Sequence, residues 1–383
     1  MSQSINRRNF IHLSAAGGAL FLGASSILAN RSFGGSPVLV SPGCRTSKVK
    51  IAKIYLGKAK PHWPTPKLDL DAEIAKYESE FTRMADDFAD VDFVVSQLVD
   101  SVDRVTEIAP KVQDADGILL IHLTIGIGGE LQAVLDLKKP TVLFAAPYSG
   151  HEWVGFGQWE KKAPVTCILT SDTNQLAAAV RPLRAIHHLR EGRLLNITSR
   201  EMPADYLAAI KDKFGTEMMQ ITRDRTLQAY ESIPDDAARA EAKKLIAEAD
   251  KVVEPDEDEI FRSCKLALAF EKLMDEENAT VITADCYGSM YHNLPAFPCI
   301  GFTRLNDKGL GGICESDLAS AMTFMILQGL SGKPGFISDP TMDMSTDSAI
   351  LAHCLGSTKM DGPGGARAPY RIRTIMERQE GAV

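Results

Sequence analysis

The feature of this chain that most constrains its fold is the alternation of short apolar runs with amphipathic segments. The runs 117–123 (GILLIHL) and 141–146 (TVLFAA) are almost wholly apolar, and the stretches between such runs carry apolar residues at helical spacing. Short apolar runs of this kind are typical of strands buried on both faces of a parallel sheet. The sequence therefore predicts an α/β protein with two consecutive doubly wound parallel-sheet domains.

The predicted organisation has four parts. They are a signal peptide and linker over 1–47, an N-terminal flavodoxin-like α/β domain over 48–171, a second α/β domain over 172–335, and a C-terminal segment over 336–383. We expect strands at 49–56, 91–99, 117–123, 141–146, 165–170, 194–197, 218–221 and 280–283. The main helices are expected at 71–88, 103–113, 235–253 and 257–276.

The N-terminus has the composition of an export signal. Arg7 and Arg8 precede a weakly apolar run, 13–29, that is rich in Ala, Gly and Ser. This pattern is typical of a twin-arginine signal, with cleavage after Ala29, and it predicts a periplasmic protein with no membrane association after signal removal. The alternative is a membrane anchor, but the run is barely long enough and too rich in glycine to span a bilayer.

Charge and cysteine spacing exclude several functions. The formal charge is −8, and it falls to −10 without the two leader arginines, so we expect no nucleic-acid partner. No CxxC pair occurs among the seven cysteines, which argues against a zinc knuckle or a disulfide framework and favours small buried residues. The cysteines stand at positions 44, 167, 264, 286, 299, 314 and 354.

Three potential ligands for a hard metal ion lie in the last third of the chain. Glu315, Asp339 and His353 are 24 and 14 residues apart, and each is expected at the end of a strand or glycine-rich turn. Two carboxylates and an imidazole suit an octahedral divalent ion. Each residue also has a simpler interpretation: Glu315 as a helix start, Asp339 as a turn residue before proline, and His353 as a core histidine.

The sequence around these residues resembles the L-fucose/L-arabinose isomerase superfamily, in its shorter fucose-isomerase-like branch. The motifs that carry the resemblance lie between about 280 and 375, and they are TRLNDKG (303–309), CESD (314–317), LSGKPGF (330–336), SDP (338–340) and HC (353–354). The resemblance implies that Glu315 and Asp339 are metal-binding catalytic carboxylates and that His353 is a ligating histidine. Members of the superfamily usually continue into a C-terminal β-rich domain that completes the site. The resemblance therefore implies that the C-terminal segment here is the start of a truncated domain, or that this branch has dispensed with the domain.

The resemblance also implies the reaction. We expect a metal-dependent aldose–ketose isomerase that acts on a small-molecule sugar through an enediolate. Its ion would be Mn²⁺, or another divalent cation such as Mg²⁺, Fe²⁺ or Co²⁺, and the enzyme would be a homo-oligomer with sites at subunit interfaces. Two alternatives stay open: an exported sugar-binding protein of two α/β lobes, and a sugar epimerase, dehydratase or lyase on the same scaffold.

Loops that follow predicted strands supply further candidates for the sugar site. Ligands of open α/β sheets bind beyond the carboxyl ends of the strands. His62 and Trp63 follow the first strand, His151 and Trp153 follow the fourth, and Asp285 follows the strand at 280–283. We expect the aromatic rings to stack on a sugar and Asp285 to contribute to the edge of the site.

Overall fold

The computed structural model describes residues 39–375 and 378–383, which fall into two units. Unit 1 comprises residues 47–187, and unit 2 comprises 188–383 together with 39–46. The predicted export signal lies outside the described residues. Within the described parts of the chain, no helix is both long and apolar enough to cross a membrane.

Unit 1 is built on a five-stranded sheet. Its strands are β1 (Val49–Leu56), β2 (Val91–Val99), β3 (Gly117–His122), β4 (Thr141–Ala145) and β5 (Val165–Leu169). Its helices are α2 (Leu70–Arg83), α3 (Val102–Gln113), α4 (Gly128–Leu135), α5 (Phe156–Trp159) and α6 (Gln175–Ala179), with short 3₁₀ turns η2 (Ala85–Phe88) and η3 (Glu152–Gly155).

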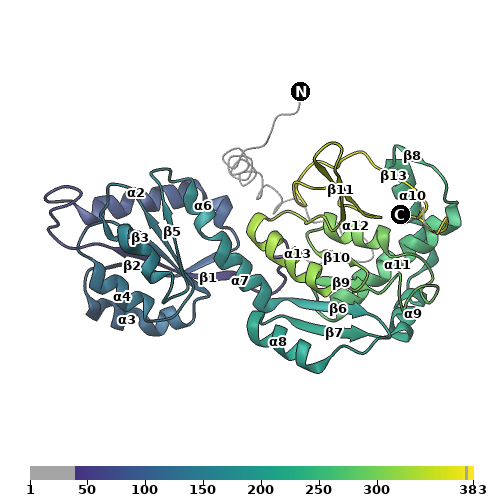
Figure 1. Ribbon diagram of the computed structural model, residues 1–383, viewed down its shortest axis with the longest axis horizontal. Helices are drawn as coiled ribbons and strands as arrows, with labels where there is room; N and C mark the ends of the chain where they lie inside the picture. The colour runs from purple at the N-terminus through teal and green to yellow at the C-terminus, as the bar shows by residue number, and fades with distance from the viewer. Residues whose placement is uncertain (1–38, 376–377) are drawn as a thin grey trace. The chain divides into compact units, whose positions relative to one another are not determined.

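All five strands run parallel, in the order β2-β1-β3-β4-β5. Alternate side chains of β1 enter two different cores: Ile54 packs with residues of α3 and α4 on one face, and Ile51 packs with residues of α2 on the other. Figure 1 shows these helices on opposite sides of the sheet. The predicted α/β fold is thus confirmed, and the strand order places a topological switch point between β1 and β3.

The two units divide at residues 187/188, within α7 (Arg181–Glu191), rather than at the expected position 171/172. The reason lies in the packing of the segment after β5. Leu176, Val180 and Leu183 are fully buried in the core of unit 1 beside β1 and β4. Residues 170–175 therefore form a surface turn within unit 1.

Unit 2 contains a second parallel sheet. The strands are β6 (Arg193–Ile197), β7 (Glu217–Ile221), β8 (Lys251–Val252), β9 (Val281–Ala284), β10 (Gly311–Cys314), β11 (Asp339–Asp343), β12 (Ser348–Ala352) and β13 (Arg371–Ile372). The helices are α8 (Ala204–Phe214), α9 (Arg223–Glu231), α10 (Asp235–Glu248), α11 (Glu257–Glu276), α12 (Cys299–Asp307) and α13 (Leu318–Ser331).

Four of these strands form the sheet, in the order β10-β9-β6-β7, all parallel. Residues of α11 and α12 pack on one face, and residues of α13 pack on the other. The helix expected over 235–253 ends at Glu248, because residues 251–252 pair instead with β13, near the end of the chain. Such a long-range pairing leaves no local mark in the sequence.

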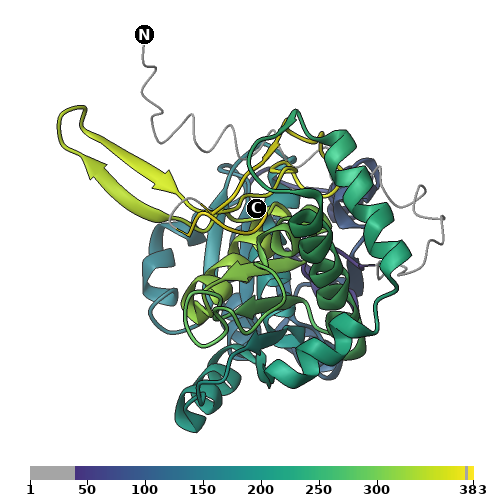
Figure 2. The ribbon, with the colours of Figure 1, turned by 90° about the vertical axis from the view of Figure 1, so that its right-hand side faces the viewer.

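The segment after α13 begins with an antiparallel hairpin, β11–β12, that the sequence did not predict. Nearly all of its residues are exposed, and Figure 2 shows it as an arm that extends from the rest of unit 2. Asp339 is the first residue of the hairpin, and His353 directly follows its last residue. The two proposed ligands are therefore cross-strand neighbours at its base, since Asp339 pairs with Ala352.

Candidate active site

The candidate site of unit 2 lies at the carboxyl end of β10, the edge strand of the sheet. Among the described residues, no strand pairs with the outer side of β10, and the side chain of Asn306 binds the backbone there instead. Its Oδ1 accepts from the amide of Gly312 at 2.7 Å, and its Nδ2 donates to the carbonyl of Gly312 at 3.1 Å. Gly312 also lets α12 approach closely, because a Cβ there would lie 2.3 Å from Cα of Phe302. The strand is thus held rigidly against α12.

Glu315 follows β10 in a backbone conformation that is unfavourable for a glutamate. Its φ is +65°, and Ser316 follows with a φ of +54°. Two bonds hold this turn: the amide of Ser316 donates to the carbonyl of Ala284, and its hydroxyl donates to Oδ1 of Asn196 at 2.6 Å. Left-handed backbone in residues other than glycine is concentrated at functional sites. Glu315 does not cap α13, since Asp317 performs that role.

The segment that carries His353 is bound along one face of α12. Cys299, Thr303 and Asp307 are four residues apart and therefore lie on the same side of the helix. Cys299 contacts Cys354, with their sulfur atoms 3.6 Å apart. The hydroxyl of Thr303 donates to the carbonyl of Gly356 at 3.2 Å. This helix therefore positions the residues that follow the hairpin.

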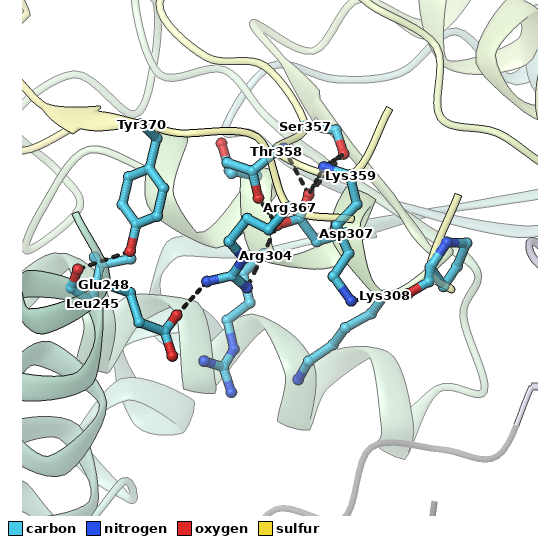
Figure 3. A network of polar contacts seen from close by, with 12 residues as sticks. Leu245, Glu248, Arg304, Asp307, Lys308, Ser357, Thr358, Lys359, Arg367 and Tyr370 are labelled. Atoms are coloured by element: carbon cyan, nitrogen blue, oxygen red, sulfur yellow. Dashed lines mark hydrogen bonds and ion pairs between the residues drawn. The ribbon is translucent and has the colours of Figure 1, made fainter. Parts of the chain in front are cut away.

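Asp307 makes the strongest of these attachments. Its buried carboxylate accepts hydrogen bonds from the hydroxyl of Ser357 at 2.6 Å and from the amides of Thr358 and Lys359 at 2.8 and 3.0 Å. The hydroxyl of Thr358 donates to its second oxygen. Figure 3 shows these contacts converging on the carboxylate.

The chain beyond this point is fastened to α10. Arg367 pairs with Glu248, and the hydroxyl of Tyr370 donates to the carbonyl of Leu245 at 2.7 Å. The segment from His353 onward is thus anchored at several points to the helices of unit 2.

These attachments bring His353 to Glu315. Nε2 of the imidazole lies 3.9 Å from Oε1 of Glu315, and its side chain is only 5% exposed, against 43% for the glutamate. Burial and the nearby charge of Asp339 raise the pKa of Glu315. The hydrogen bond to Cys354, together with the charges of Glu315 and Asp339, raises the pKa of His353. All three predicted ligands therefore act on one another, although they come from three segments of the chain.

The donor types of these three residues suit a hard divalent ion. The Nε2–Oε1 distance of 3.9 Å is too long for a hydrogen bond. Ligands of one octahedral ion with bonds near 2.1 Å lie about 3.0 Å apart when cis and about 4.2 Å apart when trans, so the two side chains would approach each other by about 1 Å to bind one ion as neighbouring ligands. Glu315, Asp339 and His353 would hold the ion, and the exposed side of Glu315 leaves room for a substrate.

Asp285 lies at the end of β9 but is bound within the protein. Its carboxylate accepts from the amide of Ser289 at 2.8 Å and pairs with Arg200 at 3.0 Å, and the residue is 5% exposed. It also accepts from Thr198, which follows β6. These contacts join the loops after β6 and β9.

The aromatic candidates of unit 1 follow β1 and β4. The rings of Trp63 and His151 lie together, with centroids 5.5 Å apart, and Trp63 is 40% exposed. The carbonyl of Trp63 accepts from the amide of Ile125, which follows β3, so this pair lies at the switch point between β1 and β3. His62 is exposed beside Trp63. The side chain of Trp153 lies outside the described part of the structure.

Unit 1 also contains a buried polar cluster that the sequence did not reveal. His122 lies between Ser149 and Glu152, at 2.8 Å from Nδ1 and 3.0 Å from Nε2, respectively. Glu152 also accepts from the amide of Gly126 at 2.7 Å, just before the N-terminus of α4. Ser149 is buried and donates to the carbonyl of Ala146, so it is not an activated nucleophile. The cluster holds the loops after β3 and β4.

Comparison with known proteins finds a distant similarity to a sugar isomerase. The sulfoquinovose isomerase of Alkalicoccus urumqiensis is 24% identical over 101 residues, which amount to 26% of this chain and 23% of that enzyme. The similarity is to a sugar isomerase, and it spans about a quarter of each protein. No protein-family model matches the chain.

Proposed function

We propose that this protein is a metal-dependent sugar isomerase that interconverts an aldose and a ketose through an enediolate. The observation that supports this most is the convergence of Glu315, Asp339 and His353 beyond β10, with Glu315 held in left-handed backbone. The similarity to a sulfoquinovose isomerase supports the same class of reaction. A bound Mn²⁺, Mg²⁺, Fe²⁺ or Co²⁺ would supply Lewis-acid stabilisation of the charge that develops on the substrate oxygens.

The side chains of the site have complementary roles in this reaction. One carboxylate moves a proton between C1 and C2 of the open-chain sugar, and the other accepts the proton of the neighbouring hydroxyl. The side chain of Glu315 is more exposed than that of His353, and its raised pKa makes it a better proton acceptor. We therefore assign to Glu315 the transfer of the carbon-bound proton. His353 is buried and acts as a fixed ligand.

The Trp63–His151 pair is proposed as a stacking surface for the sugar ring. An exposed indole beside an imidazole offers the apolar face and polar edge that carbohydrates require.

We further propose that the enzyme is a homo-oligomer. Met342, Met344, Ile350 and Leu351 of the β11–β12 hairpin expose large apolar side chains, which subunit interfaces commonly bury. Light scattering on the purified protein tests this assembly.

Deuterium exchange tests the reaction. In D₂O with Mn²⁺ and a panel of free aldoses that includes sulfoquinovose, the protein should exchange the hydrogen on the carbon next to the carbonyl, because enediolate chemistry breaks that bond. Glu315→Gln keeps the shape but cannot accept the proton, so exchange should fall by at least about two orders of magnitude. Glu276→Gln, on the exposed surface of α11, is the matched control and should retain full exchange.

The alternatives give different results. An epimerase or a lyase would also exchange deuterium but would release a different product, which NMR of the sugar identifies. A sugar-binding protein would keep tight sugar affinity in the presence of EDTA and would show no exchange. Absence of exchange with every sugar and every one of the four metals would refute the isomerase proposal.

Export through the twin-arginine pathway is a separate proposal, based on Arg7 and Arg8 and on the weakly apolar run 13–29 that follows them. Replacing both with lysine should leave the protein in the cytoplasm of a host that has this pathway, as cell fractionation would show. Equal periplasmic amounts of the variant and the parent would contradict it.

A further inference from the structure

A second group of potential ligands lies behind the candidate active site, on the other side of the His353 ring. Cys314 ends β10, His353 and Cys354 follow β12, and one ligand atom from each lies within 4.8 Å of the others. Sγ of Cys354 is 3.9 Å from Sγ of Cys314 and 3.3 Å from Nδ1 of His353. Cys299, at the start of α12, adds a third sulfur 3.6 Å from that of Cys354.

These distances agree with the edges of a metal-centred tetrahedron. With Zn–S bonds of about 2.3 Å and Zn–N bonds of about 2.0 Å, the sulfur–sulfur edge is about 3.8 Å and the sulfur–nitrogen edge about 3.5 Å. The observed sulfur–sulfur contacts of 3.6 and 3.9 Å lie on either side of the first value, and the Nδ1 contact of 3.3 Å is close to the second. Three thiols and an imidazole nitrogen are also the ligand types that thiophilic cations prefer.

The surrounding structure holds these groups in place. Asn306 and Gly312 fix β10, and Asp307 clamps the chain three residues after Cys354. Cys299 and Cys314 are 1% and 2% exposed, so the sulfur atoms are shielded from bulk water. A site whose ligands are already positioned loses little conformational entropy when it binds an ion.

We propose that Cys314, Cys354 and Nδ1 of His353 form a binding site for a thiophilic divalent cation such as Zn²⁺, with Cys299 placed to supply the fourth ligand. Each cysteine binds as a thiolate, so each ligating thiol releases one proton to solvent as the ion enters. No thiol is oxidised, and no co-reactant is needed. Cd²⁺, which has the same charge and prefers the same thiolate ligands, would bind in the same way.

The shared histidine gives this site a regulatory consequence, which rests on the proposed function. A neutral imidazole has one nitrogen lone pair free for a metal, because the other nitrogen carries the proton. When Nδ1 binds the thiophilic ion, Nε2 carries the proton and faces Glu315 as a donor rather than as a ligand. The thiophilic ion and the catalytic ion therefore compete for His353, and Zn²⁺ should inhibit the enzyme.

Cadmium titration tests the site without reference to activity. The full-length protein, reduced and freed of metal with a chelator, should bind one Cd²⁺ with the ultraviolet charge-transfer absorption of cadmium thiolates. Cys354→Ser should abolish this absorption, and Cys314→Ser should weaken Cd²⁺ binding at least tenfold. Cys264→Ser, a buried cysteine of α11, and Cys167→Ser, in β5, are matched controls that should leave the titration unchanged.

Thiol labelling of the unmodified protein gives a second measurement that does not depend on the folding of a variant. Under mild denaturation, Cd²⁺ should protect Cys314 and Cys354 from alkylation, as peptide mass spectrometry would show, while Cys167 reacts at its original rate. Buried thiols that merely pack together would show neither the absorption nor the protection, and either negative result would overturn the proposal. Absorption that persists in Cys354→Ser would overturn it as well.

The two proposals can fail separately. Glu315→Gln should lose deuterium exchange yet keep the cadmium absorption, because the carboxylate is not a thiophilic ligand. One equivalent of Cd²⁺ should lower the affinity for Mn²⁺ at least tenfold in the parent, but not in Cys314→Ser. If exchange and Mn²⁺ binding are absent while the cadmium site is present, only the proposed isomerase function is wrong.

Discussion

Asp307 provides the sharpest test of how the candidate site is held together. Three of its hydrogen bonds end on one carboxylate oxygen, and their donors are the hydroxyl of Ser357 and the amides of Thr358 and Lys359. In Asp307→Asn the amide oxygen can still accept all three, but as a neutral group. The hydroxyl of Thr358, which donates to the second oxygen, can rotate and accept from the new NH₂ group instead.

The magnitude follows from these contacts. A hydrogen bond to a charged group contributes about 1.5–3 kcal/mol and a neutral one about 0.5–1.5 kcal/mol, so each of the three bonds loses about 1 kcal/mol. We therefore expect Asp307→Asn to lower the free energy of unfolding by about 2–3 kcal/mol, measured from urea denaturation. It should also weaken Mn²⁺ binding, because the clamped segment carries His353.

The matched control is Asp361→Asn, on the same C-terminal segment. Its carboxylate is 74% exposed and pairs only with Lys333 among the contacts described, so the substitution should cost less than about 0.5 kcal/mol. Equal urea midpoints for the parent and Asp307→Asn would refute the assignment of Asp307 as the clamp. A loss of stability with unchanged Mn²⁺ affinity would show that the clamp does not position the ligands.

Three other predictions concern packing, pH and the sugar site. Gly312→Ala places a Cβ 2.3 Å from a backbone atom of α12 and should destabilise the protein by about 3 kcal/mol or more. The control is Gly129→Ala, in α4 with open space around it, which should stabilise the protein by less than about 1 kcal/mol. Thermal melts of the two variants and the parent measure both effects. Burial opposes ionisation of Glu152, but its hydrogen bonds outweigh burial and lower its pKa from 4.5 to about 2. Its contribution to stability is therefore complete above pH 4.5 and is lost as the pH falls towards 2, so Glu152→Gln should show a shallower fall of melting temperature across that window; identical slopes would contradict this. Trp63→Ala should weaken sugar binding about tenfold with little change in melting temperature, as calorimetry would show, and a large loss of stability with unchanged affinity would show instead that Trp63 is a core residue.

The sequence by itself determined the fold class and most of the strands. Runs such as 117–123 are apolar at every position except His122, and only a strand covered on both faces, or a buried helix, can bury such a run. The sequence also indicated Glu315, Asp339 and His353, because these residue types at turn and strand ends are the chemistry of a hard metal ion. The structure places His353 beside Glu315 and Asp339 at the base of the hairpin that His353 follows, while their role as ligands stays a prediction.

The remaining features depend on contacts between distant residues. No spacing in the sequence shows that Cys299, Cys314 and Cys354 meet, since α12, β10 and the segment after β12 each contribute one of them. The repeat of Cys299, Thr303 and Asp307 along α12 is visible in the sequence, but its partner segment is not. The left-handed backbone of Glu315 is likewise invisible, because local preference disfavours it and only the bonds from Ser316 to its neighbours hold it. Local sequence patterns indicate which face of a helix or strand is buried. Which residues pack against that face depends on contacts between distant segments, which form only when the chain folds.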